Sequence, residues 1–523
     1  MPKLTDYTSY ADAQRLFATA RLWDLFDGNR ERLNIGHECV DRHVTPDRVA
    51  LRIAHAAGPD ETIGFAELAA WSSRFAHWLA AEGVQPGDRV AIMLEPSLPF
   101  YAALFGTMKY GAIAVPLFTL FGVDGVRLRT NDCTPVLLLT TSQKIPDLAG
   151  RDGPRTIAAD ESFMAGLRSF PGTYETRTSA ADLAIFQYTS GTTREMPDAI
   201  RHTHRAIVVV MNAALYGTGL RPGDKFFCPS SPAWGHGLWH GTLAPLALGI
   251  ETGAYAGKFD AGRLLKALRD YGSTNLSAAA THYRMMKNTG VTNEDRMALH
   301  KLSFTGEPID PETSRSIQQA FQTPVCSMYG TTEIGVVLAN YPGAADFTVK
   351  EGALGRPVPG VEVQVQRPDG TRCQPEELGE IKVRRHDAWF PTKDRGRVDA
   401  DGYFYHAGRA DDVIVSAGWT MSAVEIENAI LGHPAVQAAA VIGVADALRG
   451  LVVKAFVVPA VGFPTGADVI ASIQALVRSR LSQHEFPRIV VFVQDLPRTP
   501  AGKINRKALR DQEANIPEPE HIV

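Results

Sequence analysis

Apolar and polar residues follow two different periods in the first part of the chain. Between residues 61 and 115, apolar residues recur at helical spacing in FAELAAWSSRFAHWLAAEG, and the short β-rich run RVAIML follows. A second helical stretch then leads into GAIAVPL, and similar apolar runs recur in TPVLLLTTS, ADLAIFQYTSG and KFFCPSS. Helices that alternate with short apolar strands predict an α/β architecture with a buried sheet.

The pattern changes near residue 350. From there LGRPVPGVEVQVQRPDGTRCQPEELGEIKVRR places Pro and Gly turns between alternating apolar and polar residues, which predicts antiparallel strands. After GRADD at 408–412 the pattern changes again, to a compact succession of short strands and two helices. We therefore predict an α/β protein with a large N-terminal domain at 1–410, built of packed mixed sheets, helices and a β-rich subdomain, and a small α+β domain at 411–523.

Composition and charge exclude several classes of protein. The chain has 523 residues, of which 45% are hydrophobic and 21% charged, so it is neither disordered nor fibrous. Its 53 Lys and Arg against 57 Asp and Glu provide no global positive field for nucleic acid or an anionic membrane. The N-terminus lacks the apolar region of a signal peptide. The apolar stretch 206–220 contains Asn and Gly and falls short of a membrane span.

The cysteines are few and scattered. The five cysteines lie far apart and form no CxxC or Cys/His cluster, which argues against a disulfide framework and a structural zinc site. The default expectation is a soluble cytoplasmic protein.

The strongest local motif is a turn of small hydroxyl residues after ADLAIFQ. Backbone N–H and side-chain O–H groups gathered at one turn suit phosphate oxygens, although composition alone favours an ordinary Ser/Thr turn or a helix cap. The chain contains no GxxxxGK[ST], GxGxxG or GxSxG motif. The residues of this motif are Tyr188, Thr189, Ser190, Gly191, Thr192 and Thr193.

Further motifs follow in a fixed order, and together they carry a family resemblance. They are Gly306-Glu307-Pro308, Tyr329-Gly330-Thr331-Thr332-Glu333, Asp394, GRADD at 408–412, and Pro500-Ala501-Gly502-Lys503. With these motifs in this order, residues 40–510 resemble the adenylate-forming superfamily of acyl-CoA synthetases, peptide-synthetase adenylation domains and luciferases. The style of the motifs is most similar to acetyl-, medium-chain and aryl-CoA synthetases.

The resemblance implies a role for each matching residue. Thr189, Ser190, Gly191, Thr192 and Thr193 would hold the β- and γ-phosphates of ATP. Gly306, Glu307 and Pro308 would line the adenine, and Tyr329 would stack on it. Gly330 and Thr331, in the same motif as Tyr329, would also bind the nucleotide. Thr332 would contact the α-phosphate, and Glu333 would help hold Mg²⁺. Asp394 would accept hydrogen bonds from the ribose hydroxyls, and Arg409 would lie beside the nucleotide. Asp411 would be the hinge of a mobile C-terminal domain.

Lys503 matches the lysine that acts in adenylation. A carboxylate that attacks a triphosphate brings like charges together, and a compact ammonium group neutralises both in the transition state. Most lysines are solvated surface residues, but here the PAGK motif favours the catalytic role.

The acyl and thiol sites are less well marked. Trp234, in SPAWGHGLWHG, matches an aromatic position of the acyl pocket, and His236 is a second candidate; His240 and His282 are further ones. Each is also an ordinary core residue type. Gly418 matches a glycine along the pantetheine tunnel, with Trp419 next to it, but Trp419-Thr420-Met421 replaces the usual Tyr-Arg-Ile.

These residues predict an ATP-dependent, AMP-forming acid:CoA ligase that uses ATP, Mg²⁺ and CoA on a medium-chain, alicyclic or aromatic carboxylic acid. Dimers are common among such relatives, so a homodimer is one open possibility for the oligomeric state, and charge and hydropathy predict no nucleic-acid or membrane partner. Two alternatives stay open. One is transfer of the acyl group to the phosphopantetheine arm of a carrier protein, and the other is a catalytically impaired nucleotide-binding homologue.

The second alternative arises from a departure in the phosphate loop. Aligning the chain on Pro197 places Asp198 where the family has a lysine, which puts an anion near the departing pyrophosphate. We predict that Arg194 supplies the missing cation, so Arg194→Ala raises the KM for ATP in steady-state kinetics. An unchanged KM would show that the remaining hydroxyl and N–H groups suffice.

Overall fold

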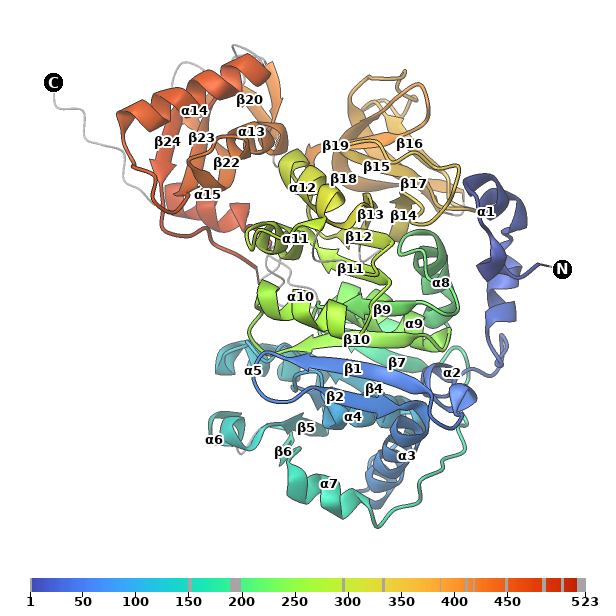
Figure 1. Ribbon diagram of the computed structural model, residues 1–523. Coiled ribbons are helices and arrows are strands. Elements are labelled where there is room, and N and C mark those ends of the chain that lie inside the picture. The colour runs from blue at the N-terminus through green and yellow to red at the C-terminus, as the bar shows by residue number, and fades with distance from the viewer. Residues whose placement is uncertain are drawn as a thin grey trace. The chain divides into compact units, whose positions relative to one another are not determined.

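The computed structural model describes residues 2–148, 153–188, 199–293, 297–331, 334–385, 387–409, 413–416, 419–446, 450–481, 486–499 and 503–514. The chain forms two compact units (Figure 1). Unit 1 contains residues 1–306, 316–349 and 358–360, and unit 2 contains 307–315, 350–357 and 361–523. The hinge at Asp411 lies outside the described residues, and the boundary beside it stays a prediction.

Unit 1 contains a mainly parallel sheet with short, largely buried strands. All its neighbouring strands pair in parallel except β7 and β8, which form an antiparallel pair. The strand order is β6 (Arg155–Ala158), β5 (Leu137–Thr140), β3 (Arg89–Ile92), β4 (Ile113–Pro116), β7 (Leu183–Gln187), β8 (Ile200–Thr203).

A second sheet of unit 1 has a parallel centre. Strands β13, β12, β11, β9, β10 and β1 pair in parallel in that order, and β14 and β2 join antiparallel at either side. The bounds are β14 (Gly335–Ala339), β13 (Val325–Thr331), β12 (Lys301–Thr305), β11 (Asn275–Ala279), β9 (Lys225–Cys228), β10 (Glu251–Ala256), β1 (Val49–His55), β2 (Glu61–Gly64).

A buried polar network fixes the amino ends of three of these strands. The Nζ of Lys301, the first residue of β12, lies 2.8 Å from both carboxylate oxygens of Asp224, which precedes β9. Asn275, the first residue of β11, donates to Asp224 Oδ2 at 3.3 Å. A buried charge left without its partner is strongly destabilising, so this network disfavours any relative slip of β9, β11 and β12.

Helices pack on these sheets with apolar faces inward. The apolar spacing predicted a helix over the residues that form α3, and the structure confirms it. Gly106 of α4 lets this helix approach α3 closely, because a Cβ there would lie 2.6 Å from the Ser72 carbonyl oxygen. The helices of unit 1 include α1 (Tyr10–Leu16), α2 (Ile35–Cys39), α3 (Phe65–Ala81), α4 (Leu98–Tyr110), α5 (Val123–Cys133), α6 (Ile145–Leu148), α7 (Glu161–Leu167), α8 (Ala206–Tyr216), a π-helix η5 (His236–Leu243), α9 (Ala244–Ala247), α10 (Ala261–Asp270) and α11 (Ala280–Lys287).

Unit 2 contains the antiparallel strands that the turn-rich sequence after residue 350 predicts. Their order is β16 (Val363–Gln366), β17 (Gly379–Arg385), β18 (Ala388–Val398), β19 (Phe404–Arg409), β15 (Ala353–Pro357). Helix α12 (Pro311–Phe321) contains residues of both units.

The C-terminal part of unit 2 has a sheet and a core of its own. Its strands are β21 (Trp419–Ser422), β20 (Val413–Ser416), β23 (Gly450–Pro459) and β22 (Val436–Asp446), with β24 (Ile489–Phe492) beside β23. Residues of helices α13 (Ala423–Leu431) and α14 (Ala467–Arg480) pack into its hydrophobic core, and α15 (Arg506–Ala514) follows near the C-terminus. Within the described part of the chain, no helix has the length and apolarity that crossing a membrane requires.

Candidate nucleotide and acyl site

Several predicted residues lie at the carboxyl edge of the parallel strands of unit 1. The last registered pair between β12 and β13 is Phe304 with Ser327, and two residues further along each strand come Gly306 and Tyr329. Neighbouring parallel strands end at the same edge of a sheet, where open α/β sheets bind ligands. The fold of unit 1 therefore brings Gly306, the first residue of the predicted adenine segment, and Tyr329, the predicted stacking residue, to the same edge.

Both glycines at this edge are required by the backbone. Gly306 has a φ of +100°, a conformation that side chains rarely adopt. A Cβ on Gly330 would lie 1.9 Å from the carbonyl oxygen of Gly335, on the antiparallel strand β14. A residue with a side chain is therefore disfavoured at position 306 and at position 330, next to Tyr329.

Much of the predicted phosphate and metal site lies outside the described residues. This is true of Thr189, Ser190, Gly191, Thr192, Thr193 and Arg194, and also of Thr332 and Glu333. Thr331, the last residue of β13, is described. Among the described residues no group of three or more His, Cys, Asp or Glu could hold a metal ion. The role of Glu333 toward Mg²⁺ therefore stays a prediction.

Unit 2 brings together two other predicted residues. Asp394 on β18 is the registered partner of Arg409 on β19, although the two are distant in sequence. The Asp394 side chain is buried, with Oδ1 3.7 Å from Nε2 of His406. The Thr392 hydroxyl accepts a hydrogen bond from the Asp394 N–H at 3.1 Å. Glu307 and Pro308 also belong to unit 2, in the segment that precedes α12.

The acyl-pocket candidates lie around the π-helix η5. His236 begins this helix, and its ring centroid lies 5.3 Å from that of Trp234. Isolated π-helical turns occur frequently at functional sites. Gly237 is required there, because a Cβ would lie 2.1 Å from the carbonyl oxygen of Ser231.

A buried hydrogen-bond chain that sequence reasoning missed holds His236. Ser230 Oγ lies 3.0 Å from His236 Nδ1, and His236 Nε2 lies 2.8 Å from Ser277 Oγ. Ser303 Oγ donates to Ser277 Oγ at 2.9 Å. The serines come from β11, β12 and the segment after β9, so the chain spans three strands. Their only sequence signal is a hydroxyl residue inside an apolar run, as in NLSAA and KLSF.

The π-helix is also tied to the strand that precedes the predicted phosphate loop. Trp239 Nε1 donates to Oε1 of Gln187, the last residue of β7, at 3.0 Å. The His240 ring centroid lies 6.2 Å from that of His236. His282 accepts from the Ala279 N–H at 3.2 Å and lies against the Phe259 ring. These contacts assemble aromatic and imidazole rings into one region of unit 1.

Lys503 lies in a short hairpin of unit 2. The Thr499 N–H donates to the Lys503 carbonyl oxygen at 2.7 Å, and Arg498 forms an antiparallel bridge with Ile504. Asn505 Oδ1 accepts from the N–H of Ala508, in the first turn of α15. The backbone of Lys503 is therefore held by Thr499, and the residue after it by Arg498.

An ion pair anchors this hairpin to the rest of unit 2. Arg506 donates through Nε and Nη2 to the two carboxylate oxygens of Glu427, at 3.0 and 2.5 Å. Glu427 on α13 also accepts from the Val441 N–H at 2.8 Å. A bidentate arginine pair with a further hydrogen bond has a well-defined geometry. The segment that follows Lys503 is thus anchored to α13.

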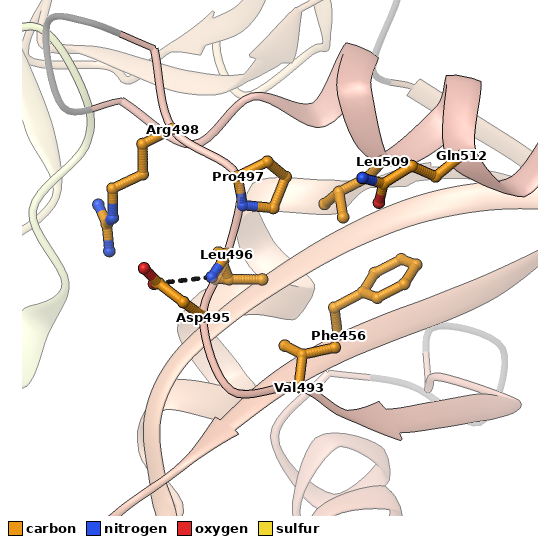
Figure 2. Close-up of a pocket in the computed structure, with 8 residues that line it drawn as sticks. All are labelled: Phe456, Val493, Asp495, Leu496, Pro497, Arg498, Leu509 and Gln512. Atoms are coloured by element: carbon orange, nitrogen blue, oxygen red, sulfur yellow. Dashed lines mark hydrogen bonds between the residues drawn. The ribbon is translucent and has the colours of Figure 1, made fainter.

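A cleft lies beside the hairpin (Figure 2). Its floor is apolar, formed by Phe456, Val493, Leu496 and Leu509, and the side chains of Asp495 and Arg498 lie at one side. The apolar floor is continuous with the small hydrophobic cluster against which Ile504 packs.

The thiol-site candidates are only partly described. Gly418 lies outside the described residues, and Trp419 is the first residue of β21, in register with Ser416 of β20. The assignment of these two residues to a pantetheine tunnel stays a prediction.

Comparisons with known proteins place these features in context. A family model described as AMP-binding enzyme matches residues 40–388, and one described as AMP-binding enzyme C-terminal domain matches 425–503. The chain is 27% identical to acetyl-coenzyme A synthetase of Bacillus subtilis (strain 168), over 93% of this chain and 91% of that protein. It is 30% identical to 3-hydroxybenzoate–CoA ligase of Aromatoleum sp. (strain CIB), over 87% of this chain and 92% of that protein.

A solved structure is similar over nearly the full length. The acyl-CoA synthetase of Brucella canis superposes with a TM-score of 0.74 at 31% identity, over 97% of this chain and 99% of that one. The predicted α/β fold class and the predicted family are confirmed by these matches.

Buried histidines of unit 1 give its stability a pH dependence. Burial lowers the pKa of His202 and His240 to about 4 and that of His204 to about 3, from an ordinary 6.5. Between the lowered and the ordinary value the unfolded chain binds more protons than the folded one, so lowering the pH favours unfolding. This loss begins as the pH falls below 6.5 and ends near the folded pKa values.

We predict that the urea midpoint of unfolding falls between about pH 7 and about pH 5, and that His204→Asn reduces this slope. Asn retains an acceptor for the Ile35 N–H, which His204 Nδ1 accepts at 3.0 Å, but does not titrate. The control is His300→Asn at an exposed histidine, which should leave the slope unchanged. Equal slopes for wild type and His204→Asn would contradict the assignment.

Proposed function

The chain belongs to the AMP-binding enzyme family, and from this premise we propose that it is an ATP-dependent, AMP-forming acid:CoA ligase. The observation that carries this conclusion is the pair of family models, which match in order and together reach from residue 40 to residue 503. The relatives described above, which are an acetyl-CoA synthetase, an aryl-CoA ligase and an acyl-CoA synthetase, support the same reaction.

The reaction proceeds in two steps. A carboxylate oxygen attacks the α-phosphorus of ATP and the bond to pyrophosphate breaks, which leaves an acyl-adenylate. The CoA sulfur then attacks the acyl carbon, and AMP leaves with the oxygen that joined the two parts. Because both steps use one acyl site, a mobile C-terminal domain that turns near Asp411 would serve each in turn.

We assign the residues as follows. Lys503 neutralises the charge that develops between carboxylate and α-phosphate. Tyr329, with the backbone at Gly306 and Gly330, receives the adenine, since neither glycine places a side chain beside it. Asp394 accepts from the ribose, and the hydroxyl residues of 189–193 hold the outer phosphates. Mg²⁺, held by Glu333 and phosphate oxygens, would supply charge neutralisation of the triphosphate.

The acid we propose is apolar or flat, in the medium-chain, alicyclic or aromatic range. The support is the ring-lined region around η5, where Trp234, Trp239 and the buried imidazoles lie. Desolvation of an apolar acyl group supplies most of its affinity in such a pocket. We also propose a cytoplasmic location, because the five cysteines are buried and free, as expected of a reducing compartment. A homodimer is a further part of the proposal.

The function is tested by pyrophosphate release from MgATP against acetate, butyrate, octanoate, benzoate, cyclohexanecarboxylate and hydroxycinnamates, each with and without CoA. Release that requires octanoate or a cyclic acid and accelerates with CoA is the expected result. Acid-dependent release without acceleration by CoA would favour a carrier-protein acceptor. If no acid of the panel causes pyrophosphate release, the impaired homologue is favoured.

Lys503 separates the two half-reactions. We predict that Lys503→Ala lowers the adenylation rate by about a hundredfold or more, because the transition state loses its neutralising cation. The same variant should convert preformed acyl-adenylate and CoA to acyl-CoA at close to the wild-type rate. Single-turnover kinetics of each half-reaction measure the two effects, with Lys507→Ala on α15 as the matched control. An equal loss in both steps would contradict the role.

A further inference from the structure

The predicted phosphate loop is the connection of a β-hairpin. Strands β7 and β8 pair antiparallel, and their last registered pair before the connection is Gln187 with Ile200. The connection therefore begins at Tyr188 and ends at Ala199, both of which the structure describes. The hydrogen bonds between β7 and β8 do not include these two residues, so other contacts hold the ends of the connection.

One carboxylate oxygen holds both ends. The Tyr188 hydroxyl donates to Oδ2 of Asp132 at 2.6 Å, and the Ala199 N–H donates to the same oxygen at 3.3 Å. Asp132 lies on α5, more than fifty residues earlier in the chain. A hydrogen bond to an ionised carboxylate is about twice as strong as a neutral one.

The surroundings keep this arrangement in place. Tyr188 is buried in a hydrophobic cluster with Val126 and Cys133 of α5, and Ala199 packs against the same cluster. The guanidinium of Arg129, one turn before Asp132, lies over the Tyr188 ring at 5.6 Å. Tyr188 is therefore fixed by its ring as well as by its hydroxyl.

The position of Asp132 is unfavourable for the helix alone. It is in the last turn of α5, and a carboxylate there faces the negative end of the helix dipole. By contrast Asp124, in the first turn of the same helix, is at the favourable end and almost fully exposed. A carboxylate at the costly end is explained by the two hydrogen bonds that it accepts.

We propose that Asp132 is a positioning residue for ATP, which joins the two ends of the phosphate loop and so sets the loop to receive the β- and γ-phosphates. Fixing both ends of a connection removes conformational freedom that ATP binding would otherwise have to remove. The inference rests on the proposed function only in assigning residues 189–193 to the outer phosphates. AMP lacks those phosphates, so its binding does not depend on Asp132.

The test compares binding of MgATP and AMP to the full-length protein by calorimetry. Asp132→Ala should weaken MgATP about tenfold, the loss expected of one charge-assisted hydrogen bond, and leave AMP unchanged. Asp132→Asn keeps an acceptor oxygen and should recover most of the MgATP affinity. Asp124→Asn, on the exposed side of the same helix, is the matched control and should change neither ligand.

Tyr188→Phe provides an independent test if Asp132→Ala does not fold. It removes the hydroxyl that donates to Asp132 and that also lies 2.9 Å from the carbonyl oxygen of Arg129, and it should likewise weaken MgATP more than AMP. Equal loss of MgATP and AMP, or no loss of either, in folded Asp132→Ala or in Tyr188→Phe would overturn the proposal. Wild-type protein that binds neither nucleotide would instead contradict the proposed function, which keeps the two failures distinct.

Discussion

The parallel register of β9, β11, β12 and β13 is the constraint on which the candidate site depends. Asp224, Asn275 and Lys301 bind one another at the amino ends of three of these strands. Because the register is fixed there, the residues that follow the opposite ends must meet at one edge. A slip by one residue would turn Gly306 and Tyr329 to opposite faces and separate two residues of the proposed nucleotide site.

The acyl and phosphate regions share this dependence. His236 bridges the segment after β9 to Ser277 of β11, and through it to Ser303 of β12. Trp239 connects the same π-helix to Gln187, next to the phosphate loop. In this arrangement buried hydrogen bonds brace the region that we propose for the acid and connect it to the strand that precedes the proposed phosphate loop. Buried networks of this kind favour a single arrangement, since each unpaired member carries a large cost.

The sequence predicted what local pattern and motif order encode. Helix α3 follows from apolar spacing, and the strands after residue 350 follow from turn residues. The sequence did not predict the hydrogen-bonded serines around His236 or the two hydrogen bonds to Asp132. The residues that form these bonds are far apart in sequence, and each is an ordinary residue type in its local segment. Contacts of this kind exist only once the sheets have formed. The replacement of the loop lysine by Asp198 is visible in the sequence, but its effect depends on residues outside the described part of the chain.

The most direct test of the account follows one oxygen atom. The acid identified by the substrate panel is labelled with ¹⁸O in its carboxylate and converted with MgATP and CoA, and the products are analysed by mass spectrometry. If the acid attacks the α-phosphorus and CoA then displaces AMP, each AMP carries one ¹⁸O and pyrophosphate carries none. Label in inorganic phosphate or pyrophosphate, with unlabelled AMP or ADP, would contradict an acyl-adenylate route.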